Sequence, residues 1–315
     1  MEKAIVTGAA GFIGSNLSER LLKEGYSVIG IDSFEDYYPR WVKEKNLEGL
    51  KQNPAFKFVE DSLIELDLKY MVKEVDYVFH QAAQAGVRGS FGQFFDIYVR
   101  NNVMATQRLL EASKDTKIKR FVFASSSSVY GNTPSLPAQE TGILIPFSPY
   151  GVTKMASEQL VKVYNVNFGV PSVSLRYFTV YGRGQRPDMA FHKFIKSILE
   201  DRPITVYGDG TQTRDFTCVP DIVEANILAM KAPAGSVFNI GGGSRRGLKD
   251  VIDTIGSLMK VKPRIDAQQP QKGDVRDTWA DLTLAKDVLG YVPKVSLEEG
   301  LTQEIEYIRH LYGKK

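Results

Sequence analysis

Tyr150 and Lys154 stand four residues apart, directly after a Ser-Pro pair that is typical of a helix start. On a helix this spacing places a phenol and an ammonium group on one face. A free tyrosine, with a pKa near 10, is a poor base at neutral pH. A neighbouring cation favours the phenolate and brings the group into the working range of a general base. The pair is common on solvated helices, so its context decides whether it is catalytic.

A glycine-rich turn near the N-terminus has the spacing of a site for a pyrophosphate. Its five key residues follow the expected first strand and extend into the start of the expected first helix: Gly8, Gly11, Phe12, Ile13 and Gly14. Gly8 permits a tight turn, Gly11 lets backbone N–H groups approach the anion, and Gly14 lets the helix pack close to the strand. The helix N-terminus adds a partial positive charge. The turn therefore predicts dinucleotide binding.

Asp32 ends the next expected strand, 18 residues after Gly14. A carboxylate at this place accepts hydrogen bonds from both hydroxyls of an adenosine ribose. It would also repel the 2′-phosphate that distinguishes NADP from NAD. We therefore expect NAD as the cofactor.

The elements that must position these groups alternate short β-branched runs with longer amphipathic stretches. The first half predicts strands at Ala4–Val6, Ser27–Ile31, Lys57–Glu60, Tyr77–His80, Arg120–Ala124 and Ser172–Leu175. Apolar residues at spacings of three and four predict helices near Phe12–Lys23, Phe94–Ser113 and Pro149–Asn167. Strands that alternate with helices are typical of an α/β fold with a doubly wound parallel sheet.

After residue 178 the pattern changes to shorter strands mixed with helices. The expected strands are Ile204–Val206, Phe216–Val219 and Val237–Ile240. The expected helices are Ala190–Glu200, Ile222–Met230, Leu248–Met259 and Leu297–Leu311. We interpret 1–178 as a cofactor-binding domain that carries Tyr150 and Lys154. We interpret 179–315 as mainly a smaller α/β substrate-binding lobe, from which the chain can return to the sheet.

Composition excludes several classes of protein. The 315 residues are 43% hydrophobic and 24% charged, with a formal net charge of +3, which is ordinary for a globular chain with an ample core. So balanced a charge argues against nucleic acid as the partner. No apolar run approaches the roughly 18 residues of a membrane-spanning helix, so we expect no membrane partner. Cys218 is the only cysteine, so we expect no intramolecular disulfide and a cytoplasmic location. Three histidines and one cysteine predict no metal cluster.

Together, the glycine turn, Tyr150 and Lys154 resemble the extended short-chain dehydrogenase/reductase superfamily, which has a Rossmann sheet. The resemblance implies a third catalytic residue, Ser126, in a serine run that directly follows an expected strand. Its hydroxyl would relay a proton between a substrate hydroxyl and Tyr150. The resemblance also implies that Tyr150 and Lys154 contact the cofactor, as do Ser62, Leu63, Gln81, Ala82, Ala83 and Asn102.

Longer segments narrow the resemblance to the nucleotide-sugar epimerase and dehydratase group, over nearly the whole chain. These segments are DYYP (36–39), QAGVR (84–88), RYFTVYG (176–182), QRPDMAF (185–191) and RDFT (214–217). Within the group the chain most closely resembles bacterial UDP-glucuronic acid 4-epimerases. That resemblance implies a UDP-sugar substrate and a homodimer.

The residues that are missing narrow the reaction. Dehydratases of the group carry an Asp-Glu pair after the catalytic threonine, and decarboxylases a Glu before the Val-Tyr-Gly turn; this chain has Ser127 and Ser128 there. Reductases that isomerise C3 and C5 use a Cys/Lys arrangement, whereas Cys218 is expected in a strand. With no carboxylate to act as acid or base, the simplest outcome is return of the hydride to the other face of C4. We therefore expect 4-epimerisation, with tightly bound NAD that each turnover regenerates.

A glucuronic acid substrate needs groups that restrain its carboxylate, because its 4-keto intermediate is a β-keto acid prone to losing CO2. The hydroxyls of Ser127, Ser128 and Thr179 could bind both oxygens without supplying a proton. Arg186 and Arg88 are candidate cationic partners. Arg186 could equally bind the diphosphate, and this alternative stays open.

The nucleotide end of the substrate has its own candidates. Arg214 is the expected diphosphate clamp, because guanidinium binds phosphate oxygens bidentately. Asp274 and Arg276 lie in a Gly-Asp-Val-Arg segment that resembles the nucleotide-ribose motif of the group.

Two other functions stay open. One is 4-epimerisation of UDP-glucose or UDP-N-acetylglucosamine by the same residues. The other is a non-catalytic NAD-binding regulatory module, against which the presence of both Tyr150 and Lys154 argues.

Overall fold

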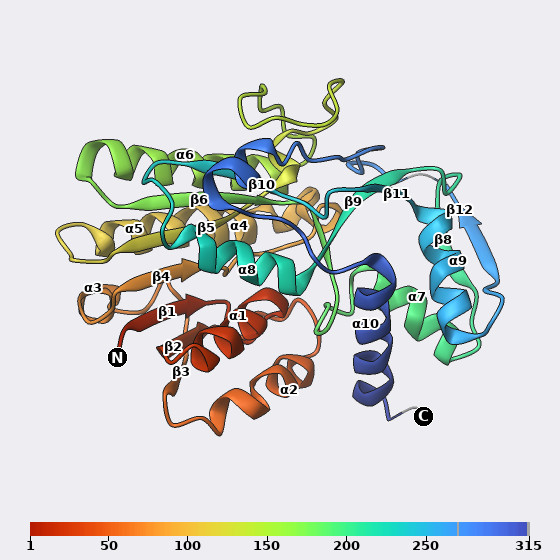
Figure 1. The fold of residues 1–315 in the computed structure, drawn as a ribbon, viewed down its shortest axis with the longest axis horizontal. Helices are drawn as coiled ribbons and strands as arrows, with labels where there is room; N and C mark the ends of the chain where they lie inside the picture. The colour runs from red at the N-terminus through yellow and green to blue at the C-terminus, as the bar shows by residue number, and fades with distance from the viewer. Residues whose placement is uncertain (270, 314–315) are drawn as a thin grey trace.

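The computed structural model describes residues 1–269 and 271–313, and its centre is a sheet of seven strands. In chain order these are β1 (Lys3–Thr7), β2 (Ser27–Asp32), β3 (Phe56–Glu60), β4 (Tyr77–His80), β5 (Arg120–Ser126), β6 (Ser172–Tyr177) and β10 (Val237–Ile240). Their spatial order is β10, β6, β5, β4, β1, β2, β3, and every neighbouring pair is parallel (Figure 1). The predicted doubly wound parallel sheet is confirmed. The order reverses between β1 and β4, which is where such sheets bind ligands.

Helices cover both faces of this sheet (Figure 1). One face carries α1 (Phe12–Lys23), α2 (Arg40–Lys51) and α8 (Val219–Ala229). The other carries α3 (Leu68–Lys73), α5 (Ala105–Ser113) and α6 (Pro149–Phe168). Alternate residues of a strand point to opposite faces, so Val6 packs in the first core and its neighbour Ile5 in the second. Burial on both faces explains the near-continuous apolar runs of the central strands.

A second group of elements lies at the carboxyl ends of the central strands (Figure 1). Its strands are β7 (Thr179–Tyr181), β8 (Ile204–Tyr207), β9 (Thr213–Cys218), β11 (Arg245–Gly247) and β12 (Ile265–Gln268). Its helices are α7 (Ala190–Leu199), α9 (Leu248–Met259) and α10 (Leu297–Leu311), which share a core of their own. The chain returns from this group to the central sheet between β9 and β11, where α8 packs on α1 and β10 pairs with β6. The segment Val237–Ile240 thus extends the central sheet.

The helix predicted at Phe94–Ser113 is divided into several segments. Short 3₁₀ turns at Arg88–Ser90 and Gly92–Phe94 lead into α4 (Phe95–Tyr98), then a π-helical segment at Val99–Met104, then α5. The widened π turn changes which side chains face the sheet, and such turns often accompany functional sites. A 3₁₀ turn at Ser127–Val129 and a π segment at Ala285–Leu289 complete the helical elements that the structure describes. Within the described residues, no helix combines the length and apolar character needed to span a bilayer.

Candidate active site

The glycine turn after β1 forms the predicted cradle for a pyrophosphate. Gly8 has φ +70°, and a Cβ added there would lie 2.9 Å from the backbone nitrogen of Ala82. A Cβ on Gly14 would overlap the Gly8 carbonyl. Gly11 is the N-cap of α1, and no side chain caps this helix start. The first-turn N–H groups of α1 are therefore available to an anion, and the turn that presents them requires glycine at positions 8 and 14.

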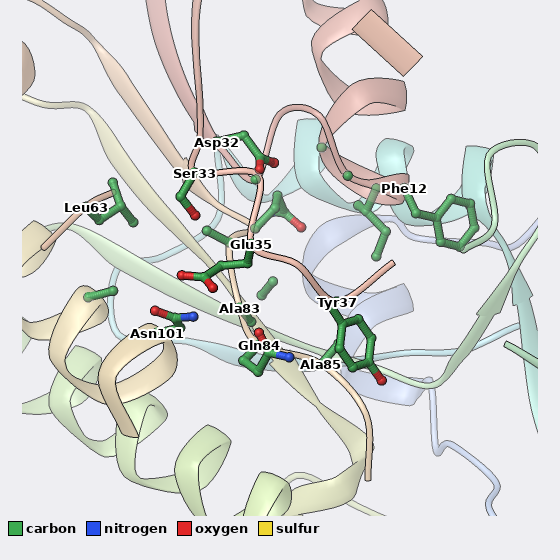
Figure 2. Close-up of a pocket in the computed structure, with 18 of the residues that line it drawn as sticks. Phe12, Asp32, Ser33, Glu35, Tyr37, Leu63, Ala83, Gln84, Ala85 and Asn101 are labelled. Atoms are coloured by element: carbon green, nitrogen blue, oxygen red, sulfur yellow. The ribbon is translucent and has the colours of Figure 1, made fainter. Parts of the chain in front are cut away.

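Asp32, at the end of β2, lies at one side of the same cavity (Figure 2). Its two carboxylate oxygens accept hydrogen bonds from the backbone N–H groups of Ala10 (3.2 Å) and Phe34 (2.9 Å). The Lys43 ammonium lies 3.5 Å from Asp32 Oδ1, and both side chains are 8% exposed. The carboxylate is thus fixed in place with lone pairs left for ribose hydroxyls, as NAD requires.

Most predicted cofactor contacts lie together around this cavity. Its wall includes Gly8, Gly11, Phe12, Ile13, Gly14, Asp32, Ser62, Leu63, Gln81, Ala82, Ala83, Tyr150 and Lys154. Asn102 is the exception: it is 1% exposed, its Oδ1 accepts from Gln84 N (2.7 Å), and its Nδ2 donates to Gln84 O (3.1 Å) and Thr153 Oγ1 (2.9 Å). Asn102 therefore supports the wall from behind, and its neighbour Asn101 lines the cavity (Figure 2).

Tyr150 lines both this cavity and a second one, the cleft between the central sheet and the second group of elements. Ser148 caps α6 by accepting from Gly151 N (3.1 Å), which starts the helix just before Tyr150. Lys154, one turn later, is 3% exposed. Ser126 ends β5 and lines the cleft. The three predicted catalytic residues are thus brought together where a cofactor and a substrate would meet.

Burial shifts the pKa values of both Tyr150 and Lys154. Desolvation lowers the pKa of Lys154 to about 7, with the Glu158 carboxylate opposing that shift. Burial also raises the pKa of Tyr150, against the lowering effects of the Ser126 hydroxyl and the Arg186 guanidinium. Because Lys154 titrates close to neutrality and Tyr150 above its usual range, the lysine alone does not make a phenolate. A positive charge brought by the oxidised nicotinamide would favour it.

A buried ion pair stands behind Lys154. Glu158, one further turn along α6, accepts from Arg176 through both carboxylate oxygens, at 2.6 and 3.0 Å. The Ser125 hydroxyl also donates to Glu158, at 2.6 Å. Arg176 in turn donates to the hydroxyl of Tyr130 at 2.7 Å. The network ties β5, β6 and α6 together directly beneath the catalytic residues.

The cleft gathers six of the eight predicted substrate contacts. They are Arg88, Ser127, Ser128, Thr179, Arg186 and Asp274. Arg88 and Asp274 pair with each other at 2.6 Å, so a loop after β4 meets the segment after β12 across the cleft. Burial of Ser127, Ser128 and Thr179 is partial, which leaves their hydroxyls open to a ligand.

Arg214 and Arg276 lie elsewhere. The Arg214 guanidinium donates to the backbone carbonyls of Thr213, Val275 and Arg276, at 2.6–2.8 Å, and lies outside the cleft lining. Three of its five N–H groups are therefore engaged, two of them by the segment that carries Asp274. The Arg276 side chain is 73% exposed and also lies outside the lining.

Several residues at the two cavities were not predicted from the sequence. Lys43 on α2 shares the buried face of that helix with Leu47 and Leu50, and a lysine on such a stripe is a recognisable signal. The cleft also contains cations from α7 and the turn after it: Lys193, Lys196 and Arg202. Nothing in the local sequence separates these from ordinary surface cations. Among the described residues, no group of three or more His, Cys, Asp or Glu side chains is arranged to hold a metal ion.

The sequence of this chain matches those of known proteins over nearly its whole length. Residues 4–241 match the family described as the NAD dependent epimerase/dehydratase family. YtcB of Bacillus subtilis, an uncharacterized UDP-glucose epimerase, is 46% identical over 98% of this chain and 99% of its own length. A UDP-glucuronate 4-epimerase of Thermodesulfobacterium geofontis is 38% identical, over 96% of this chain and 95% of its own.

A solved structure shares the whole architecture. The UDP-glucuronic acid 4-epimerase of Bacillus cereus, crystallised with UDP-glucuronic acid and NAD, superposes with a TM-score of 0.96. The two chains are 45% identical, and the match covers 98% of this chain and 100% of the other.

Proposed function

The chain belongs to the NAD dependent epimerase/dehydratase family and is an NAD-dependent UDP-sugar 4-epimerase, and from that premise we propose that its substrate is UDP-glucuronate, which it converts to UDP-galacturonate. The observation that carries the choice of sugar is the cleft wall beside Tyr150. There three hydroxyls, from Ser127, Ser128 and Thr179, stand on the same cleft as the Arg186 guanidinium. Such a set of donors suits a carboxylate.

Proton transfer is the task of the chain's own residues. Tyr150, as phenolate, accepts the proton of the sugar 4-hydroxyl, beside the Ser126 hydroxyl that also lines the cleft. Lys154 stabilises the phenolate from the cofactor side. Bound NAD+ supplies a reversible hydride acceptor at the same carbon. After the sugar turns in the cleft, the hydride returns to the opposite face of C4 while Tyr150 returns the proton to the 4-oxygen, so the reaction is redox-neutral.

Charge pairing in the cleft supports epimerisation over elimination of water. The described residues that line the cleft include two carboxylates, Asp188 and Asp274. Asp188 is paired with Arg186 at 2.9 Å, and Asp274 with Arg88 at 2.6 Å. Against the raising effect of burial, the Arg186 guanidinium lowers the pKa of Asp188, which makes this carboxylate a poor acid for expelling a hydroxyl group, and Asp274 is engaged by Arg88. The pairing therefore favours return of the hydride to C4 over elimination of water.

The deciding experiment follows UDP-glucuronate and UDP-galacturonate by NMR with the purified protein and no added NAD. We expect conversion to a stable ratio of the two, without accumulation of NADH. Parallel incubations with UDP-glucose and UDP-N-acetylglucosamine test the neutral sugars, of which UDP-glucose appears in the name of YtcB. Faster turnover of either neutral sugar than of UDP-glucuronate would reject the proposed substrate.

We also propose that the enzyme is a homodimer. Val152, Val163 and Val166 lie along one side of α6 and are 43%, 48% and 71% exposed. Met104, at the end of the π segment that packs beside α6, is 49% exposed. Burial of this apolar strip against a second copy would form an intersubunit four-helix bundle. Light scattering at micromolar concentration should give twice the chain mass of 35.2 kDa, and a Val163→Glu variant should give the single mass.

A further inference from the structure

Arg186 occupies the boundary between the cofactor cavity and the cleft, and it lines both. Tyr150 lines the same two cavities, which places Arg186 near the sugar end of the cleft. The side chain is 21% exposed, so it is largely withdrawn from solvent. An arginine that is held this deeply needs a structure that fixes its direction, because its long stem has many rotamers.

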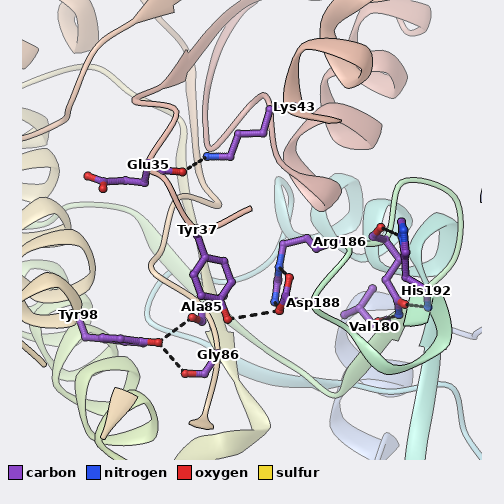
Figure 3. A network of polar contacts seen from close by, with 11 residues as sticks. Glu35, Tyr37, Lys43, Ala85, Gly86, Tyr98, Val180, Arg186, Asp188 and His192 are labelled. Atoms are coloured by element: carbon purple, nitrogen blue, oxygen red, sulfur yellow. Dashed lines mark hydrogen bonds and ion pairs between the residues drawn. The ribbon is translucent and has the colours of Figure 1, made fainter. Parts of the chain in front are cut away.

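Asp188 and Tyr37 provide that structure (Figure 3). Asp188 accepts from Arg186 Nε and Nη2, each at 2.9 Å, in a bidentate pair. The hydroxyl of Tyr37, from the loop after β2, donates to Asp188 Oδ2 at 3.3 Å. Tyr37 itself is packed over Gly86, where an added Cβ would overlap its hydroxyl. The loop after β2 and the loop before α7 therefore meet at one carboxylate.

The bidentate pair leaves a defined part of the guanidinium for a ligand. Among the described residues only Asp188 is hydrogen-bonded to this side chain, through two of its five N–H groups. The two N–H groups of Nη1 and one of Nη2 remain. Because Asp188 also balances the charge of Arg186, the site offers directed donors and little excess charge. Such a site binds most tightly a ligand whose oxygen atoms lie in the directions of the free N–H donors.

We propose that Asp188, held by Tyr37, is a positioning residue that directs the remaining N–H groups of Arg186 to the sugar carboxylate and so sets the preference for an acidic UDP-sugar. This rests on the proposed function, because only an acidic sugar offers Arg186 an anionic partner beside Tyr150. The pair Arg88–Asp274 differs, since its side chains are 44% and 34% exposed and solvent screens it.

The test compares Asp188→Asn and Tyr37→Phe with two matched controls at the opposite end of the sheet. Asp76→Asn removes a carboxylate charge that pairs with Lys119 at 3.0 Å. Tyr77→Phe removes a hydroxyl that donates at 3.4 Å to Glu2. Both controls should keep kcat and KM within about twofold of the wild type.

We expect Asp188→Asn to raise KM for UDP-glucuronate about tenfold, with a smaller change in kcat, and Tyr37→Phe to raise it about threefold. The inhibition constant of UDP, which has no sugar, should stay within about twofold of the wild type in both variants. An unchanged KM would overturn the proposal. So would an equal rise in the UDP inhibition constant, since that places Arg186 on the diphosphate.

A pH profile separates positioning from a merely structural role. The charged or titratable groups that face Tyr150 are Arg186, Tyr98 and Lys154. Without the charge of Asp188, Arg186 acts more strongly on Tyr150 and lowers its pKa further. The acidic limb of kcat/KM should therefore move to lower pH in Asp188→Asn and stay in place in Asp76→Asn.

Failure of the proposed function remains distinguishable from failure of this inference. If the wild type turns over UDP-glucose and ignores UDP-glucuronate, the choice of sugar is wrong. The pH profile measured with UDP-glucose then decides the positioning role alone. An acidic limb that does not move would reject it.

Discussion

Replacing Glu158 by glutamine tests the buried network beneath the catalytic residues. The Glu158 and Arg176 side chains are 3% and 5% exposed, and the carboxylate accepts three hydrogen bonds of 2.6–3.0 Å. Removing one charge of a buried pair costs about 3–5 kcal/mol, because the other charge is left without compensation. Glutamine keeps the volume and one acceptor, so we expect about 3 kcal/mol. For a chain of 315 residues that loss lowers Tm by roughly 4–5 °C.

Glu158→Gln should also change catalysis through Lys154. The Glu158 charge opposes the desolvation that lowers the pKa of Lys154 to about 7. Without that charge the pKa of Lys154 falls further, and less of the lysine is protonated at neutral pH. Since the phenolate of Tyr150 needs a neighbouring cation, the alkaline limb of kcat should move to lower pH.

Thermal unfolding and a pH–rate profile measure the two effects. Glu111→Gln is the matched control, because Glu111 also accepts from a basic residue and a hydroxyl but is 51% exposed. An exposed pair contributes about 0–1 kcal/mol, so this control should lower Tm by about 1–2 °C at most. Equal Tm losses in the two variants would refute the expected loss of about 3 kcal/mol for the buried pair. An unmoved alkaline limb would refute the link to Lys154.

Three further outcomes are expected. Tyr150→Phe should lower turnover about 10²–10⁴-fold or more and leave Tm and bound NAD unchanged, as measured by NMR turnover assays, thermal unfolding and absorbance. Thr179→Ala should slow epimerisation and release more UDP-4-keto-pentose, seen by NMR, because a charge-assisted hydrogen bond of about 1.5–3 kcal/mol no longer restrains the carboxylate. Burial raises the pKa of Glu304 well above its usual range, so the folded state keeps a proton that the unfolded chain has lost once pH exceeds about 4.3. The stability that this proton linkage provides is complete at acid pH and declines as pH rises, so Glu304→Gln should raise Tm at pH 8 and change it little at pH 4.5.

The parts of the site that depend on short-range spacing could be predicted from the sequence. The glycines of the first turn and the Tyr150–Lys154 pair each lie on one local element, so their spacing decides their geometry. Asn102 shows the limit of that reasoning. The resemblance implied a cofactor contact for Asn102, whereas the residue of the π segment Val99–Met104 that lines the cavity is its neighbour Asn101.

Long-range pairings were beyond sequence reasoning because they join residues whose local patterns are ordinary. Arg214 has the right chemistry for a diphosphate clamp, yet its donors meet carbonyls of a segment some 60 residues later, Val275 and Arg276. Arg186 and Asp188 are near neighbours, but their bond to Tyr37 spans 151 residues. Such contacts are decided by how loops from different elements meet above the sheet.

The charge balance of the cleft gives the selection of an acidic sugar a physical basis beyond single contacts. Its lining contains five cationic side chains: Arg88, Arg186, Lys193, Lys196 and Arg202. Two carboxylates line it as well, and Glu200 pairs from outside with Lys196 and Arg202. The five cationic side chains therefore outnumber the three carboxylates, Asp188, Asp274 and Glu200. UDP-glucuronate carries one negative charge more than a neutral UDP-hexose, and a cleft of this sign raises its local concentration and its rate of association. The N–H groups of Arg186 near Tyr150 then bind the carboxylate of a substrate whose association the positive charge of the cleft has already accelerated.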